Sequence, residues 1–320
     1  MIPRLSILML HIPDGFLSVP VALIGWLLAI LFIGLALRQT REQFDERQIP
    51  LMGVMAAFIF AAQAINFPIL GGTSGHLLGG ALAAIVLGPW AAVLVMAAVI
   101  GLQGLLFQDG GLLVMGWNIM NMGVLTAFTG AAVYRWVRDW LGDGRGSLIL
   151  GGAAGAWLSV MAAALATSLE LAASGTSPLN IVLPAMLGVH AFIGIGEAII
   201  TVGALLLIYS TRPDLLQQGA GAAGQKSSTW VAAGLVLALI VAFFSFAASS
   251  APDGLERVAE DQGFLETAFE PIYNLLPDYT IPFIENEMVS GIVAVIVGTL
   301  VVFGLVYLVG RLLRQPKRLS

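Results

Sequence analysis

The chain has no cysteine and few charged residues. Without cysteine, disulfides, thiolate metal sites and cysteine nucleophiles are all excluded. Charged residues make up only 10% of the 320 positions and hydrophobic residues 58%, with a mean hydropathy of +0.94. This balance predicts an all-α polytopic membrane protein in contact with lipid. No basic patch is interleaved with aromatic residues, so nucleic acid is not expected as a partner.

Apolar runs predict nine membrane segments. A spanning helix needs about 20 apolar residues, and proline or glycine-rich breaks separate one run from the next. The third run is too short to span alone, so we expect it to be tilted and extended or partly re-entrant. The nine runs are 21–37, 51–67, 77–87, 90–107, 112–133, 148–173, 181–209, 230–248 and 289–309.

A linker rich in Gln, Gly, Ala and Ser divides the chain at 217–228. Such a composition is typical of a flexible connection between domains. We therefore expect a seven-helix domain at 1–216, and a second domain at 229–320. The second domain would contain two transmembrane helices and an external loop at 251–287.

The charges predict the orientation in the membrane. Cytoplasmic loops are enriched in Lys and Arg, and 12 of the 14 basic residues fall in 38–50, 135–147, 211–228 and the tail from 310. Loop 251–287 has nine acidic residues and one basic residue. The N-terminus is therefore expected outside and the C-terminus in the cytoplasm. This orientation places His11, His76 and Asp109 on the outer face.

Two of the three histidines lie in short segments rich in glycine, proline and polar residues, HIPDGFLS at 11–18 and GGTSGH at 71–76. Imidazole nitrogen suits nickel, cobalt, copper and zinc. If the chain starts at Met9 or Leu10, the terminal amine and a backbone amide add two more nitrogens, and a planar nitrogen site favours Ni(II) or Cu(II). The alternative is that His11 only caps or anchors at the membrane interface while His76 bonds a loop carbonyl.

Other polar residues lie within the apolar runs. His190 and Glu197 are seven residues apart and thus share one helix face. Ionisable groups inside a membrane are functional candidates, although an internal contact that locks two helices would explain them equally well. Asn118 and Asn121 are expected to supply hydrogen bonds between helices or around the site.

An enzyme is the alternative from another functional class. Gly72-Thr73-Ser74-Gly75 fits the G-x-S-G pattern of rhomboid-type intramembrane serine proteases, with His190 as the base. Such a dyad requires Ser74 and His190 within hydrogen-bond reach.

Three motifs resemble the CbiM/NikM family over residues 9–210: HIPDGFLS at 11–18, GGTSGHLLGGALAA at 71–84 and LGVHAFIGIGEA at 187–198. Members of this family are the substrate-binding membrane (S) components of energy-coupling factor (ECF) transporters for cobalt and nickel. Beyond the linker, SAPDGLERVAEDQGF at 250–264 resembles the PDGLE domain of the small N component. The whole chain thus resembles a fused M–N protein.

The resemblance implies a seven-helix S-component bundle, with metal bound on the outer face. The ligands would be the N-terminal amine, a nearby backbone amide, His11 and His76. The family begins Met-His, whereas eight residues precede Met9 here and Leu10 follows it. Removal of residues 1–8, or a start at Met9, would make Met9 a ligand. Residues expected around the site or along the ion path are Asp14, Ser74, Asp109, Asn118, Asn121, His190 and Glu197.

The expected function is ATP-driven uptake of Ni²⁺, or Co²⁺ for cobalamin biosynthesis, across a prokaryotic inner membrane. The ion is cargo, and no resident cofactor is expected. ATP hydrolysis would be carried out by CbiO/NikO-like ATPases, joined through a CbiQ/NikQ-like coupling subunit, so the chain itself would not be an enzyme. A partner-independent divalent-cation carrier is a further alternative. Loop 251–287 would gather or load cations, or be a solvated loop.

Overall fold

The computed structural model describes residues 11–42, 48–216, 228–269, 271, 273 and 275–313, which are mostly helical. Within these ranges, six helical segments are long and apolar enough to cross a membrane. They are α1 (Val19–Glu42), α4 with its π-helical end (Pro89–Phe107), α7 (Arg145–Ala173), α8 (Leu179–Thr211), α9 with its 3₁₀ end (Thr229–Ala247) and α11 (Glu287–Leu313).

The other three predicted segments form shorter or interrupted helices. Helix α2 (Gln48–Gln63) has 16 residues, and α3 (Gly80–Leu87) has eight, all of them buried. The run predicted at 112–133 becomes α5 (Met115–Asn118), a π-helical stretch and α6 (Thr126–Leu141). Of the nine predicted segments, six are therefore long and apolar enough to cross a membrane, while α2 and α3 are short and largely buried inside the protein.

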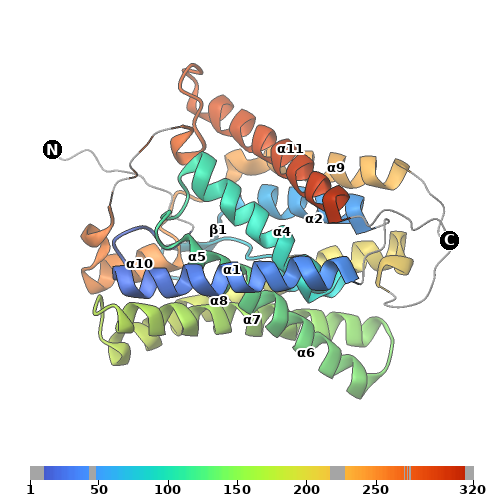
Figure 1. Ribbon diagram of the computed structural model, residues 1–320, viewed down its shortest axis with the longest axis horizontal. Coiled ribbons are helices and arrows are strands. Elements are labelled where there is room, and N and C mark those ends of the chain that lie inside the picture. The colour runs from blue at the N-terminus through green and yellow to red at the C-terminus, as the bar shows by residue number, and fades with distance from the viewer. Residues whose placement is uncertain are drawn as a thin grey trace.

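Two groups of helices pack side by side (Figure 1). Helix α7 lies between α6 and α8, while α2 packs against α9 and α11. Close approach of α6 and α7 depends on glycine, since a Cβ on Gly155 would lie 2.9 Å from the carbonyl oxygen of Gly130. Small residues at helix contacts are the usual means of close packing in membranes. The second domain is thus joined to the first through α2.

A short antiparallel hairpin follows α2. Strands β1 (Phe67–Ile69) and β2 (Thr73–Gly75) pair with Phe67 opposite Gly75. The turn contains Gly71 and Gly72 at φ +84° and +71°, a conformation that favours glycine. The run predicted to continue as helix to residue 67 therefore ends at Gln63, and the hairpin leads directly to His76.

The predicted external loop 251–287 is folded against the first domain over much of its length. Helix α10 (Gly254–Gln262) begins with a capping box, in which Asp253 accepts from the Glu256 N–H at 2.8 Å. It packs against α8 and β2 at one end of the bundle (Figure 1). The alternative of a fully solvated loop is wrong for this segment.

Candidate metal site

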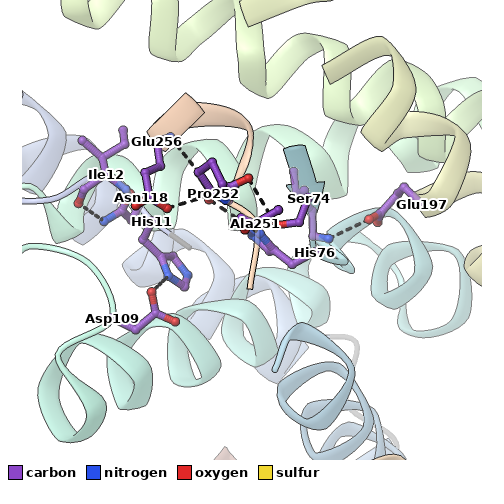
Figure 2. Close-up of polar contacts among 12 residues, drawn as sticks. His11, Ile12, Ser74, His76, Asp109, Asn118, Glu197, Ala251, Pro252 and Glu256 are labelled. Carbon is purple, nitrogen blue, oxygen red and sulfur yellow. Dashed lines mark hydrogen bonds and ion pairs between the residues drawn. The ribbon is translucent and has the colours of Figure 1, made fainter. Parts of the chain in front are cut away.

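His11 and His76 lie together in the folded chain. Their ring centroids are 6.1 Å apart, and the residues are 2% and 8% exposed (Figure 2). The two come from segments 65 positions apart. The structure thus brings together the two histidines that the sequence singles out.

The backbone next to His11 is fixed by the loop between α4 and α5 and by the last residue of α5. Ile12 donates its N–H to Asn118 Oδ1 and accepts from Asn118 Nδ2, both at 3.0 Å. Asp14 Oδ1 accepts the N–H groups of Leu113 and Val114 at 2.9 and 3.2 Å. Asp14 and Asn118 therefore hold the backbone on the C-terminal side of His11.

Asp109 contacts the His11 ring directly. Its Oδ1 lies 2.8 Å from His11 Nδ1, and its Oδ2 accepts a hydrogen bond from the Tyr279 hydroxyl at 2.8 Å. A carboxylate that accepts from Nδ1–H leaves Nε2 with its lone pair, which is the usual arrangement behind a metal-binding histidine.

The loop that carries His76 is held by Glu197 of α8. The Glu197 carboxylate accepts the N–H groups of Leu78 and Gly79 at 2.6 and 2.8 Å. Gln63 of α2 donates to the Leu78 carbonyl at 2.8 Å. The backbone after His76 is therefore fixed from two helices.

Residues 251–253, just before α10, cover the loop that carries His76. Ser74 donates its N–H to the Pro252 carbonyl at 2.8 Å and its hydroxyl to the Ala251 carbonyl at 2.7 Å (Figure 2). Asp253 Oδ2 lies 3.9 Å from His76 Nδ1. Burial, with the nearby His11, lowers the pKa of His76 to about 3, and burial raises the pKa of Asp253 to about 8. Burial therefore disfavours the charged form of both groups.

Both rings keep one buried nitrogen for a ligand. Within the described residues, Nε2 of His11 and Nε2 of His76 have no hydrogen-bond partner. Both histidines line a cavity of about 60 Å³, enough for several waters or one ion with some of its water. No group of three or more His, Asp or Glu side chains with metal-binding geometry occurs in the described ranges. A metal ion bound between the two histidines would therefore need further ligands from elsewhere.

The deeper polar residues line the same cavity but do not pair as expected. Asn121 donates to Glu170 Oε2 at 2.9 Å, and His190 Nδ1 lies 2.8 Å from the Met186 carbonyl. Both Asn121 and His190 line the cavity. These bonds do not form the alternative, a His–Glu or His–Asn contact that locks two helices. Glu197 holds the loop after His76, and His190 Nδ1 meets a carbonyl of its own helix.

Two predictions remain, Met9 as a metal ligand and the protease dyad of Ser74 and His190. Met9 lies outside the described residues, so its role as a ligand stays a prediction. The protease dyad is not formed, because the Ser74 hydroxyl bonds the Ala251 carbonyl and His190 Nδ1 faces the Met186 carbonyl.

Sequence reasoning missed three residues near the site: Asp253, Tyr279 and Glu170. Asp253 carries a detectable signal, since Asp253 followed by Glu256 is a capping-box pattern that predicts a helix at 254. Glu170 is an acidic residue within an apolar run, which is itself a functional signal. Tyr279 lies in no motif.

Together these features define a polytopic membrane protein with a buried imidazole pair suited to a transition-metal ion. The chain belongs to the CbiM family, described as the cobalt uptake substrate-specific transmembrane region, which matches residues 11–215. Residues 228–315 match the PDGLE domain. The chain is thus a CbiM/NikM-type transport component fused to a PDGLE part, and not an enzyme.

Full-length relatives share both parts. A putative fused nickel transport protein, NikMN, from Archaeoglobus fulgidus is 37% identical, over 95% of this chain and 99% of that protein. A probable fused nickel transport protein, LarMN, from Lactiplantibacillus plantarum is 31% identical, over 92% of this chain and 97% of that protein.

A shorter relative matches about two thirds of this chain. A cobalt transport protein, CbiM, from Sorangium cellulosum is 31% identical over 65% of this chain and 95% of that protein.

A solved structure has a similar fold. A crystal structure of a transition metal transporter matches with a TM-score of 0.57 and 32% identity, covering 62% of this chain and 92% of that chain. The two histidines therefore lie close together in a fold that this chain shares with a solved transition metal transporter.

Proposed function

We propose that this chain is the S component of an ATP-driven ECF-type importer that binds Ni²⁺, or Co²⁺, between His11 and His76. The observation that carries the proposal is the pair of buried, unpartnered Nε2 atoms in rings 6.1 Å apart. One metal ion with bonds of about 2 Å to one nitrogen of each ring is compatible with this spacing. Buried polar atoms without partners are rare and call for an explanation.

The remaining ligands in this proposal come from the N-terminal side of His11. Two imidazoles alone do not complete a planar or octahedral coordination sphere. A terminal amine at Met9 would add a further nitrogen donor and favour Ni(II) over Co(II). The nickel transport names of the fused relatives support the same preference.

The site is proposed to face the outside of the cell. Arginines lie at the ends of α1, α6, α8 and α11, opposite the end that carries α10 (Figure 1). Cytoplasmic ends of membrane helices are the positively charged ones. The N-terminal segment and the metal site would then be external, and the ion would be released to the cytoplasm.

Energy for uptake would be supplied by other subunits. The two lysines of this chain do not lie in a phosphate-binding loop, which supports a CbiQ/NikQ-like coupling subunit and CbiO/NikO-like ATPases as partners. Reconstitution of this chain alone and with those subunits tests the point. Uptake by the chain alone would instead support a partner-independent carrier.

The metal site is tested by titrating the purified protein with Ni(II) and Co(II), with and without residues 1–8. We expect tight binding that is lost in His11→Ala and His76→Ala. Ser74→Ala serves as the control, because it removes only the hydroxyl that bonds the Ala251 carbonyl. Binding that survives both histidine substitutions would contradict the proposed site.

A further inference from the structure

We propose that Tyr279 is a positioning residue for metal binding, which acts on the His11 ring through Asp109. The inference rests on the proposed function, because it requires His11 to bind the ion. In this proposal, the Tyr279 hydroxyl of the PDGLE part supports His11 of the CbiM part.

The first observation is a continuous line of hydrogen bonds. The Tyr279 hydroxyl donates to Asp109 Oδ2 at 2.8 Å, and Asp109 Oδ1 lies 2.8 Å from His11 Nδ1. Tyr279, Asp109 and His11 are 7%, 4% and 2% exposed, so water does not compete for these bonds. A carboxylate held at both oxygens cannot turn freely, and it therefore fixes the orientation of the imidazole and the nitrogen that carries hydrogen.

The second observation is backbone strain at two residues next to Asp109, one before it in the sequence and one hydrogen-bonded to its side chain. Among the described residues, only Gln108 and Tyr279 are non-glycine residues with positive φ, at 61° and 57°. This conformation is unfavourable for bulky side chains and persists only where surrounding contacts impose it. Gln108 directly precedes Asp109, and Tyr279 bonds it. Strain at both positions serves to bring the Asp109 carboxylate and the Tyr279 hydroxyl together.

The third observation concerns the ring of Tyr279. It stacks on Phe107 with centroids 4.6 Å apart and planes inclined by 12°. The backbone that follows is held at Ile281, whose N–H donates to Ser290 Oγ at 2.6 Å. The aromatic ring therefore stays in place without its hydroxyl, and Tyr279→Phe should remove the hydrogen bond while keeping the packing.

Nearby in the same segment, Tyr273 provides a matched control. Its hydroxyl donates to the carbonyl oxygens of Gly104 and Leu105 at 3.1 and 3.0 Å, and not to Asp109. Tyr273→Phe thus removes one tyrosine hydroxyl that joins the same two parts of the chain. It leaves the line from Tyr279 to His11 intact.

The experiment compares the two tyrosine variants in the full-length purified protein. Ni(II) affinity is measured by competition with a chromogenic chelator, and the absorption spectrum of bound Ni(II) reports its ligand geometry. We expect Tyr279→Phe to weaken binding by about ten- to a hundredfold, the usual effect of losing a group behind a metal ligand, and to shift the spectrum. Tyr273→Phe should bind Ni(II) as the wild type does.

A double-mutant cycle tests whether Tyr279 acts through Asp109. In an Asp109→Ala background, Tyr279→Phe should cause little further loss, because the acceptor is already absent. Equal losses in both backgrounds would overturn the proposal. So would wild-type affinity and spectrum in Tyr279→Phe, or equal weakening by the two tyrosine variants. A wild-type protein that binds no Ni(II) would overturn the proposed function itself.

Discussion

Asn118 pairs with Ile12 as a neighbouring β-strand would. Its side-chain amide donates to the Ile12 carbonyl and accepts the Ile12 N–H, both at 3.0 Å, with both residues buried. One side chain thus satisfies the backbone of the residue that follows His11. Because buried backbone groups are costly to leave unpaired, this contact fixes the point at which the N-terminal segment enters the site.

Asn118→Ala is expected to weaken both folding and metal binding. It removes the hydrogen-bond acceptor of the buried Ile12 N–H, which costs about 1–3 kcal/mol. The thermal unfolding midpoint should fall, and Ni(II) affinity should fall with it. Asn180→Ala, at an exposed position of α8, is the control and should change neither. Unaltered Ni(II) binding in Asn118→Ala would show that this pairing does not position His11.

Gly110→Ala should disrupt the site sterically. A Cβ at Gly110 would lie 2.6 Å from the His11 Cβ, and its φ of +94° disfavours any side chain. We expect Ni(II) binding to be lost while the helices still form. Gly142→Ala separates the two effects, because φ is also positive there, at +78°, but a Cβ meets open space. If both substitutions reduce binding equally, backbone strain rather than contact with His11 is responsible.

Glu197→Gln should loosen the loop that carries His76. Its carboxylate accepts two backbone N–H groups, from Leu78 and Gly79. A glutamine offers one acceptor oxygen and turns an NH₂ group toward the other donor. Ni(II) affinity is therefore expected to fall, more than in Gln63→Ala, which removes one hydrogen bond to the same loop. Equal affinity of Glu197→Gln and wild type in a chelator competition would contradict this role.

The long helices could be predicted because lipid requires a continuous apolar run. The run at 148–173 became α7 (Arg145–Ala173), and the run at 181–209 became α8 (Leu179–Thr211). Apolarity alone does not distinguish burial in lipid from burial in protein, which is why the largely buried α2 was predicted as a membrane segment. The Gly71-Gly72 pair was a readable hairpin signal that the helical interpretation overlooked.

The histidine pair could be predicted because both segments belong to recognisable motifs. The contact between Asp109 and Tyr279 could not, since it joins positions 170 apart, one of which belongs to no motif. Periodicity reports which face of an element is apolar. It contains no information on which distant loop folds over a site, and that is decided by packing of the whole chain.

The pH dependence of stability can be predicted at Glu256, which lies in α10 beside Asp253. Burial, with a further contribution from Glu260, raises the pKa of Glu256 from 4.5 to about 7. The folded state therefore holds this proton more tightly than the unfolded state does. Stability falls as the pH rises from about 4.5 to about 7 and then levels off, because ionisation is easier in the unfolded chain.

Glu256→Gln removes this dependence while it keeps an acceptor for the Asp253 N–H, which Glu256 Oε2 meets at 3.4 Å. The variant should match the wild type in thermal unfolding midpoint at about pH 5 and exceed it at about pH 8. Glu266→Gln, which removes one negative charge at an exposed position of the same segment, should show no such divergence. Parallel midpoints of Glu256→Gln and wild type across this range would mean that Glu256 is solvated, and that α10 does not stay packed against the site.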